Sequence, residues 1–456
     1  MKGGVVESTE AQPVGMVGLW TLRAVVVLVA LAVAVVPVWS GVRSYDTVDG
    51  FIDETPAAMK AAGKTAALLA GTLLLLQFAL SARLKWLDRV FPLDRLLSVH
   101  SVSGALAVLL AILHPLLLLA SRLYPREILE FMAWPLGVGA VLLLLLGVIA
   151  VTSLFRRFLE IRYETWRTIH LATFAAVAAM AVHSLWVGQE LAEGGVRGLW
   201  MGLLAGFGAL FVWVKVAKPL FLRALRFEVV AVQHLSPEVT NIELAVPDGV
   251  RFRYRPGQFA FLTLYRGCQP IEEHPFTISS SPTRPGQISF TIKSSGDFTA
   301  TIPATRPGNE ARVDGPYGQF SILYHPATEF VFIAGGIGIT PLMSNLRCMA
   351  DTGDRRPVTL VWACRTRQDA IFADELDELK RRLPGLCVQY VFSEEPDWSG
   401  EQGLLDEPRL ERLLKDVNRH AAVFLCGPPP MMKVVAKGLR RQGFSRRRIH
   451  TERFSL

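Results

Sequence analysis

The feature that most constrains this chain is an apolar run from Leu96 to Ala120, which contains no charged residue but two histidines, His100 and His114. A transmembrane helix needs roughly 20 consecutive apolar residues, so this run is long enough to cross a bilayer. Ionisable side chains are costly inside a membrane, and those that occur there usually face the interior of a helix bundle and serve function. We therefore predict a transmembrane helix that presents its histidines to neighbouring helices.

A second apolar run, Trp166 to Val187, also holds two histidines, His170 and His183. The first pair is 14 residues apart in sequence, about 21 Å along a helix and close to a whole number of turns. The second pair is 13 residues apart, so its rings would lie roughly 140° apart on a regular helix, and this helix must twist, tilt or contain a local bulge. Two facing helices of this kind can clamp two flat metal-centred cofactors. A lone intramembrane histidine is as easily explained by a backbone hydrogen bond, but two matched pairs favour metal ligation.

We predict six transmembrane spans. They are Val17–Trp39, Lys64–Ala82, Leu96–Ala120, Met132–Phe155, Trp166–Val187 and Gly198–Phe221. Lysine and arginine gather after spans two, four and six, which places those loops and both termini in the cytoplasm. Spans three and five then run in the same direction, so His100 can pair with His170 on the inner side and His114 with His183 on the outer side. An iron held by two histidines has no free coordination position, and each site is therefore expected to hold a haem that relays electrons.

The pattern of apolar and charged residues changes at Arg223, from long apolar spans with short loops to the mixed pattern of a globular domain. We therefore expect a membrane half fused to a soluble half. The net charge of +8 requires no nucleic acid, because much of the positive excess lies in loops beside spans. All five cysteines lie in the second half without paired metal-site spacing, which fits a reducing cytosol and excludes a usual thiolate iron–sulfur cluster.

Two domains are expected in the soluble half. Residues 223–325 consist of short alternating runs separated by Pro, Gly, Asn and Asp, which predicts a small antiparallel β-barrel. Residues 326–456 alternate strands, glycine turns and helices, which predicts a parallel sheet in a nucleotide-binding layout. With a polar tail at 1–16 and the six-span domain at 17–222, the expected fold class is a membrane α-helical bundle fused to a soluble antiparallel β-barrel domain and an α/β nucleotide-binding domain.

A glycine-rich turn follows the first strand of the α/β domain and opens a helix. The residues expected beside a bound pyrophosphate are Gly335, Gly336, Gly338, Thr340 and Pro341. Backbone N–H groups at a helix N-terminus attract phosphate and glycines let it approach, although glycine turns also serve packing. Here the chain resembles the ferredoxin–NADP reductase superfamily. With the histidine helices, it is similar to the NADPH oxidase and ferric reductase family of transmembrane electron carriers, of the bacterial type.

The resemblance implies an FAD site in the barrel domain. Its expected residues are His274, Pro275, Phe276, Thr277, Gly296 and Thr299. In the family, the aromatic packs on the isoalloxazine, the following hydroxyl residue bonds the ring, and the glycine segment holds the FAD pyrophosphate. An ordinary strand start is the alternative explanation of the first four residues.

The resemblance also implies that Cys426, Gly427 and Pro428 lie beside the nicotinamide, and that Phe454 covers the flavin until nicotinamide displaces it. Two residues follow Phe454, whereas some relatives end on the aromatic itself. A buried cysteine and a core phenylalanine are the alternatives.

Arg365 and Arg367 follow the second strand of the α/β domain, where the 2′-phosphate of NADPH would lie. No acidic residue that could bind the ribose hydroxyls of NADH stands immediately at that strand end. This favours NADPH over NADH, although solvated loop arginines would look the same.

The resemblance implies a multi-pass oxidoreductase of the cell inner (plasma) membrane, with cytoplasmic flavin and nucleotide domains. NAD(P)H would give a hydride to FAD, and electrons would pass singly through two haems b to an extracytoplasmic acceptor. Short outer loops without a metal-binding cluster favour oxygen giving superoxide, whereas an acidic first loop would attract cations. A ferric-chelate reductase stays open, as does a haem-binding membrane subunit that docks a partner redox protein. The expected partners are the lipid bilayer, NAD(P)H and oxygen or ferric chelate, with no nucleic acid and no obligatory protein partner.

Overall fold

The computed structural model describes residues 54–121, 133–187, 194–267, 269 and 271–453, together with a few separate positions before Glu54. It contains two compact units. Residues 13–218 form a helical unit, and residues 219–456 form a unit of sheets and helices, to which the N-terminal strand β1 (Val6–Glu7) belongs. Most of the predicted first span, residues 17–39, lies outside the described residues.

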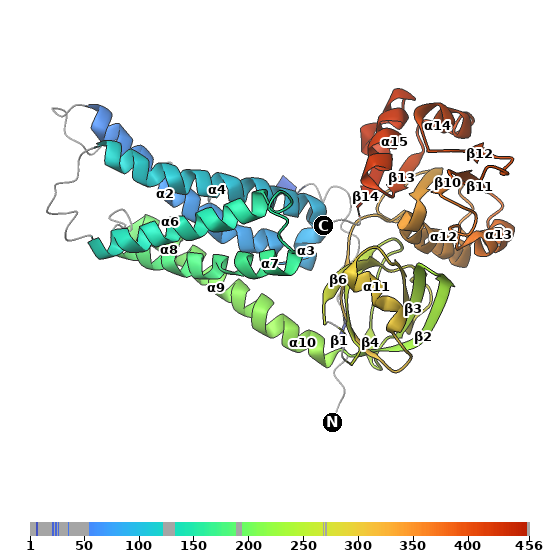
Figure 1. Ribbon diagram of the computed structural model, residues 1–456, viewed down its shortest axis with the longest axis horizontal. Coiled ribbons are helices and arrows are strands. Elements are labelled where there is room, and N and C mark those ends of the chain that lie inside the picture. Colours follow the sequence, from blue (N-terminus) through green and yellow to red (C-terminus); the bar gives the residue numbers. More distant parts are fainter. Residues whose placement is uncertain are drawn as a thin grey trace. The chain divides into compact units, whose positions relative to one another are not determined.

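The helical unit is a bundle in which α2, α4, α6 and α8 lie alongside one another (Figure 1). Its helices are α2 (Glu54–Ser81), α3 (Lys85–Val90), α4 (Leu93–Ser121), α6 (Ala133–Leu154), α7 (Tyr163–Leu171), α8 (Thr173–Val187), α9 (Gly194–Val212) and the π-helical η2 (Trp213–Ala217), which leads into α10 (Lys218–Ala224). Among the described residues, five helical stretches are long and apolar enough to cross a membrane, and they correspond to predicted spans two to six.

The structure departs from the predicted spans at two places. Helix α2 begins at Glu54 rather than near Lys64, because Pro56 is favoured in a first helical turn and several alanines follow it. The fifth span is interrupted at Ala172, between α7 and α8. There the Thr173 hydroxyl donates to the carbonyl oxygen of His170 at 2.5 Å. The local irregularity that the 13-residue histidine spacing requires is therefore present.

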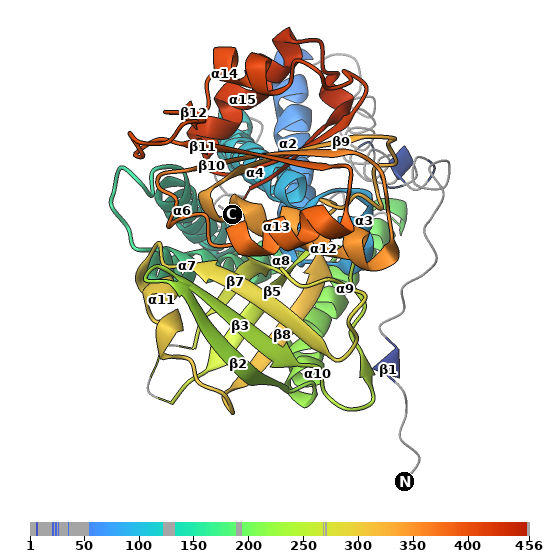
Figure 2. The ribbon, with the colours of Figure 1, turned by 90° about the vertical axis from the view of Figure 1, so that its right-hand side faces the viewer.

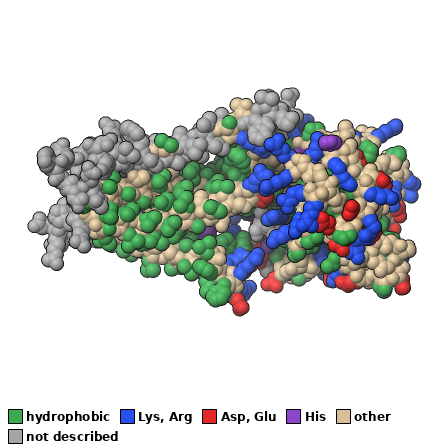
Figure 3. All heavy atoms as spheres, turned by 90° about the horizontal axis from the view of Figure 1, so that it is seen from above, with side chains coloured by type: hydrophobic (Ala, Val, Ile, Leu, Met, Phe, Trp, Pro, Cys, Tyr) green, Lys and Arg blue, Asp and Glu red, His purple; other side chains and the backbone are tan. Residues whose placement is uncertain are grey.

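Apolar side chains cover the visible face of the helical unit (Figure 3). Val102, Leu119 and Leu144 are among the large hydrophobic residues that are at least 70% exposed. An apolar surface this extensive is stable against lipid rather than water, since soluble proteins rarely expose large continuous apolar patches. The helical unit is thus built as a membrane-associated domain.

The second unit begins with a six-stranded antiparallel sheet in the order β6-β5-β8-β2-β3-β7. Its strands are β2 (Phe227–Ser236), β3 (Val239–Ala245), β5 (Phe259–Tyr265), β6 (Glu273–Thr277), β7 (Gln287–Lys293) and β8 (Glu310–Tyr317), with the short β4 (Val250–Arg251) paired to β1 and the short helices α11 (Asp297–Ala300) and η3 (Ile302–Ala304). A bridge between Ile278, directly after β6, and Phe290 in β7 joins the two ends of this order. Inward-facing residues such as Ile242 and Phe290 fill the core.

The nucleotide-binding part is a parallel sheet in the order β12-β11-β10-β9-β13-β14, as predicted. Its elements are β9 (Phe330–Gly335), η4 (Gly336–Ile339), α12 (Thr340–Thr352), β10 (Val358–Cys364), α13 (Ala373–Arg382), β11 (Leu386–Phe392), β12 (Glu401–Gln402), α14 (Glu407–Leu413), β13 (Ala422–Cys426), α15 (Pro429–Arg441), η5 (Arg446–Arg448) and β14 (Ile449–Glu452). Helices α12 and α13 cover one face and α14 and α15 the other (Figure 2). Such sheets bind ligands at the carboxyl ends of their strands.

Candidate functional site

The four intramembrane histidines form two pairs, each with one ring from α4. The ring centres are 6.0 Å apart for His100 and His170 and 6.5 Å apart for His114 and His183. Two imidazoles on opposite sides of one metal, with metal–nitrogen bonds of about 2.0 Å and ring centres about 1.2 Å behind each nitrogen, have ring centres roughly 6.4 Å apart. Each histidine therefore lies beside the partner expected from the topology, at a separation that fits one shared iron.

Backbone carbonyls orient both histidines of α4. The Nδ1 atom of His100 lies 3.1 Å from the carbonyl oxygen of Gln77, and that of His114 lies 2.9 Å from the carbonyl oxygen of Gly63. A carbonyl only accepts hydrogen bonds, so Nδ1 carries the proton in both rings. The Nε2 atom of each ring then keeps the lone pair that a metal needs.

A side chain orients His170 instead. The Ser153 hydroxyl donates to the carbonyl oxygen of Ile149 at 2.6 Å and accepts from Trp166 Nε1 at 3.1 Å. Its proton is thus committed, and His170 Nδ1, at 3.4 Å, must be the donor. Trp166 also stacks on His170, with ring centres 5.1 Å apart. In His100, His114 and His170, Nε2 is therefore the ring nitrogen left for a metal.

The residues that surround the histidines are not evident from the sequence alone. Gly139 belongs to this group, because a Cβ there would lie 2.9 Å from Cε1 of His183. Gln77 and Ser153 could have been found as polar residues inside apolar spans, which need a partner. Gly63 and Gly139 carry no such signal, since glycine is frequent in transmembrane helices.

Strand β6 carries the predicted flavin motif. The His274 ring stacks on Phe298 of α11, with ring centres 4.1 Å apart and planes at 21°, and its Nε2 lies 2.8 Å from Glu272 Oε2. This stack brings the motif next to the segment of Gly296 and Thr299. The two parts of the predicted FAD site therefore lie together.

The surroundings of the motif fit a flavin dinucleotide. Phe276 is half-buried and nearly parallel to Phe298, Pro275 is half-buried and Thr277 is buried. The Thr299 hydroxyl accepts from the N–H of Gly296 at 2.9 Å, which organises the turn. A Cβ at Gly296 would meet no described atom within 4 Å. A half-buried aromatic beside open glycine backbone suits a stacked ring and an approaching phosphate.

Arg266, which the sequence did not single out, reaches the same segment. It donates from Nη1 to the carbonyl oxygen of Thr301 at 2.6 Å and from Nη2 to its hydroxyl at 2.9 Å, and it lies over Phe298. It is 6% exposed, and among the described residues its Nε has no hydrogen-bond partner. Burial lowers the pKa of the Arg266 guanidinium, so an anion nearby would stabilise its charged form. A charged residue at the end of an apolar strand was the signal available in the sequence.

The two predicted nucleotide motifs meet at the carboxyl ends of the neighbouring strands β9 and β13. A Cβ at Gly338 would lie 2.9 Å from Gly427 Cα and would also meet the carbonyl of Cys426, and a Cβ at Gly335 would lie 2.7 Å from Pro428 Cδ. Only glycine lets these two backbones approach so closely.

The remaining residues of the turn complete this edge of the sheet. Gly336 has a φ of +51°, and no described atom lies within 4 Å of its would-be Cβ. Thr340 and Pro341 start α12, and the Thr340 hydroxyl donates to the carbonyl oxygen of Ile337 at 3.2 Å. The open side of this turn, at a helix start, is where a pyrophosphate can bind.

The thiol of Cys426 is fully buried, and burial raises its pKa above the ordinary value, so it is neutral at physiological pH. Its role beside the nicotinamide stays a prediction. Phe454 lies outside the described residues.

Arg365 and Arg367 are exposed beyond the end of β10. Arg365 lies 3.4 Å from Glu238 Oε2 and 3.6 Å from Asp369 Oδ1. The guanidinium of Arg367 packs over Trp398 at 4.9 Å. Both are therefore accessible to a phosphate near the glycine turn, although Arg365 is shared with carboxylates.

Three protein-family models match the chain in succession. The ferric reductase like transmembrane component matches residues 66–181, the FAD-binding domain residues 224–321 and the oxidoreductase NAD-binding domain residues 332–437. The chain matches a ferric reductase-like family of oxidoreductases. This ferric reductase-like protein is therefore an enzyme with FAD- and NAD-binding domains, and the matched transmembrane region contains all the paired histidines except His183.

Curated relatives match the FAD- and NAD-binding half. The stachydrine N-demethylase reductase subunit of Rhizobium meliloti is 32% identical over 48% of this chain and 64% of its own length. The glycine betaine monooxygenase reductase subunit of Chromohalobacter salexigens is 35% identical over 45% of this chain and 57% of its own length. The ferric reductase-like chain thus spans about three-fifths of these relatives. Because both are named as subunits, the expectation that no protein partner is needed has no support.

Among solved structures, the FAD/NAD-binding domain of nitric oxide dioxygenase from Vibrio cholerae covers 50% of this chain and 98% of that domain, with 24% identity and a TM-score of 0.45.

Proposed function

We propose that this enzyme carries electrons from cytosolic NAD(P)H across a cell membrane to an acceptor on the other side, with FAD and two haems b bound. The observation that carries this proposal is the separation of the paired histidine rings, 6.0 and 6.5 Å. When bound, FAD converts a two-electron hydride donor into single electrons, and haem iron relays one electron at a time. The plasma membrane and the cytoplasmic position of the flavin and nucleotide domains are part of the proposal, supported by the basic loops.

The helical unit contributes the metal ligands and their orientation. His100 and His170 would hold one haem, and His114 and His183 the other. Backbone carbonyls and Ser153 keep the protons on Nδ1, so that Nε2 would be free to bind the metal. Because two histidines would hold each iron, neither iron would have a site for substrate, and an acceptor would react at a haem edge.

The second unit contributes the hydride site. Phe276 and Thr277 would contact the isoalloxazine, and the turn of Gly296 would take the FAD pyrophosphate with Arg266 nearby. The glycine turn at the start of α12 would take the nucleotide pyrophosphate. Gly427 and Pro428 would lie beside the nicotinamide, and their close approach to Gly338 and Gly335 supports this position.

The acceptor divides the proposal into two candidate functions. Oxygen, reduced to superoxide, is the first. A ferric chelate is the second, and the match to a ferric reductase like transmembrane component favours it.

The test is a transmembrane assay with the full chain in liposomes. NADPH is supplied on one side, and an impermeant ferric chelate or a superoxide detector is enclosed on the other. We expect NADPH oxidation and acceptor reduction on opposite sides, together with a low-spin haem spectrum and two haems per chain. Reduction of the acceptor on the NADPH side only, or a wild-type protein without haem, would contradict the proposal.

Replacing Ser153 with alanine is expected to raise the midpoint potential of one haem. Without the hydroxyl acceptor, His170 loses a hydrogen bond that strengthens its donation to iron. The contact is long, at 3.4 Å, so the effect should be roughly 0.5 kcal/mol, or about 20 mV for one electron. Spectroelectrochemical titration measures it. Thr152→Ala is the matched control, because the Thr152 hydroxyl donates to Val148 and contacts no histidine.

Replacing both Arg365 and Arg367 with alanine is expected to erase a preference for NADPH. A charge-assisted phosphate contact of roughly 1.5–3 kcal/mol corresponds to about ten- to a hundredfold in kcat/KM. The exposed ion pairs that Arg365 forms with Glu238 and Asp369 are weak enough to be replaced by a phosphate contact. Turnover with NADH should change little, because NADH lacks the contacted group. Steady-state kinetics with both nucleotides decides this, and equal wild-type values would identify the arginines as solvated loop charges.

A further inference from the structure

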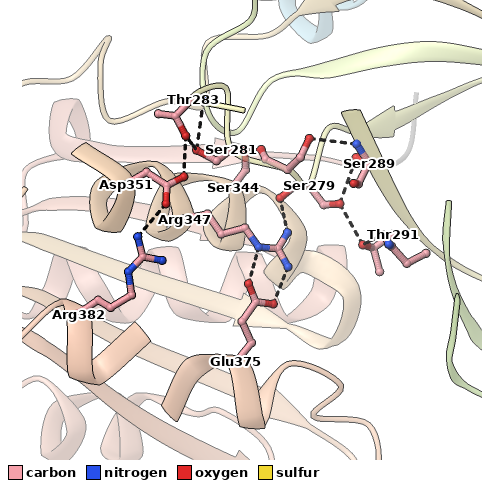
Figure 4. Close-up of polar contacts among 12 residues, drawn as sticks. Ser279, Ser281, Thr283, Ser289, Thr291, Ser344, Arg347, Asp351, Glu375 and Arg382 are labelled. Carbon is pink, nitrogen blue, oxygen red and sulfur yellow. Dashed lines mark hydrogen bonds and ion pairs between the residues drawn. The ribbon is translucent and has the colours of Figure 1, made fainter. Parts of the chain in front are cut away.

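One face of helix α12 is fastened to the chain segment 279–283, which directly follows the flavin strand β6 (Figure 4). Three residues of α12, spaced three and four apart and so lying on one helix face, make the contacts. Ser344 Oγ donates to the carbonyl oxygen of Ser280 at 2.7 Å, and Arg347 Nη1 donates to the carbonyl oxygen of Ser279. Asp351 Oδ2 accepts a hydrogen bond from the Thr283 hydroxyl at 2.6 Å. The face is therefore bonded along two turns of the helix.

Arg347 lies at the centre of this face and is held on three sides. Its Nε and Nη2 donate to the two carboxylate oxygens of Glu375 in α13, both at 2.6 Å. Its guanidinium lies 5.1 Å from the ring centre of Phe372. The third nitrogen of the guanidinium, Nη1, donates to the carbonyl oxygen of Ser279. A planar guanidinium can satisfy a carboxylate and a carbonyl at once, which a lysine ammonium cannot do in the same geometry.

The two parts that Arg347 joins carry different ligand-binding residues. Ser279 follows Thr277 of the flavin motif by two residues, on the same continuous segment. Helix α12 begins at Thr340, directly after the glycine turn, and Arg347 is seven residues beyond Thr340, about 10.5 Å along the helix. A shift of α12 at Arg347 would therefore change the position of the nucleotide turn relative to the flavin segment.

We propose that Arg347 is a positioning residue for hydride transfer, which holds α12 on the flavin segment so that the nicotinamide meets the flavin at reacting distance. This inference rests on the proposed function. In that step the C4–H bond of NAD(P)H breaks, the hydride and both its electrons form the N5–H bond of the flavin, and NAD(P)⁺ leaves. A misplacement of about 1 Å can cost on the order of a hundredfold in rate. Arg347 contacts neither predicted pyrophosphate turn, so its loss affects the rate of transfer rather than the affinity for either ligand.

The test compares Arg347→Lys with Arg356→Lys in the full chain, reconstituted in lipid nanodiscs. Arg356 is a matched control because it makes the same three kinds of contact. It donates to both carboxylate oxygens of Asp354 and to the backbone carbonyl of Ala327, and its guanidinium lies over the ring of Phe330. It does not join the flavin segment. Anaerobic stopped-flow mixing with NADPH gives the limiting rate of flavin bleaching, the half-saturating NADPH concentration and the long-wavelength charge-transfer absorbance of the nucleotide–flavin complex.

We expect Arg347→Lys to lower the limiting rate at least about tenfold and to weaken the charge-transfer band, with FAD content and half-saturation within about twofold of wild type. Arg356→Lys should leave all four unchanged. A wild-type limiting rate in Arg347→Lys, or a slower rate accompanied by an equal loss of NADPH affinity, would overturn the positioning role. If Arg347→Lys does not retain FAD, Glu375→Gln, which removes the charge but keeps the shape, must show the slower rate with full FAD content. A wild-type protein whose flavin NADPH does not bleach would instead reject the proposed function.

Discussion

His100→Ala is expected to leave one haem per chain and to abolish electron delivery across the membrane. The ring of His170 would then face no second imidazole, since its partner at 6.0 Å is gone, and a haem with one remaining ligand is lost or becomes high-spin. NADPH should still bleach the flavin, because none of the predicted flavin residues lies in the helical unit. Haem quantification and an optical spectrum of the purified variant, beside the liposome assay, measure these effects.

His114→Ala should remove the other haem with the same loss of delivery, and the double variant should hold none. His420→Ala, an exposed residue of the nucleotide-binding part, is the control and should retain both haems. Two low-spin haems in His100→Ala would mean that the histidine pairs serve helix packing.

Gly338→Ala is expected to remove nucleotide-dependent activity. Its Cβ would lie 2.9 Å from Gly427 Cα and would meet the carbonyl of Cys426, so the strand ends must move apart. Backbone atoms cannot rotate away as a flexible side chain can, and overpacking of this kind costs about 1–3 kcal/mol of the free energy of unfolding. Because both displaced segments border the predicted nucleotide site, kcat/KM for NADPH should fall on the order of a hundredfold or more. Thermal unfolding and steady-state kinetics report the two effects.

Gly353→Ala separates these effects, because Gly353 ends the same helix in a left-handed conformation, with a φ of +70° and no described atom within 4 Å of its would-be Cβ. The alanine should cost about 1 kcal/mol of stability through backbone strain alone. Its nucleotide kinetics should match wild type. Equal kinetic losses in the two variants would show that α12 is merely sensitive to destabilisation.

The parts of the fold that follow from periodicity were predictable. The spans around the histidines come from apolar runs, and the parallel sheet comes from alternating strands and helices. The irregularity of the fifth span followed from arithmetic alone, since 13 residues do not return to the same helix face. Its position at Ala172 did not, because neither proline nor glycine marks it, and the Thr173 hydroxyl that bonds the His170 carbonyl looks like any other threonine in a span.

The residues that sequence analysis missed act through partners distant in the chain. Arg347 and Ser279 are 68 positions apart, and Gly63 and His114 are 51 apart. No local pattern encodes such pairs, because each is created only when the chain has folded. Motifs such as the glycine turn are visible because the whole constraint lies within a few consecutive residues. The start of α2 is hard to predict for a different reason: acidic residues before Pro56 suit a loop, but acidic side chains also favour a helix N-terminus.

The irregular residue Ala172 lies between the two histidines of the fifth span, so that His170 belongs to α7 and His183 to α8. On one regular helix the two rings would point in directions roughly 140° apart, and a rotation that improved one pair would worsen the other. The irregularity changes the direction of one ring relative to the other within a single span. If each pair holds a haem, a substitution beside one histidine can then alter the redox potential of that haem without moving the other pair.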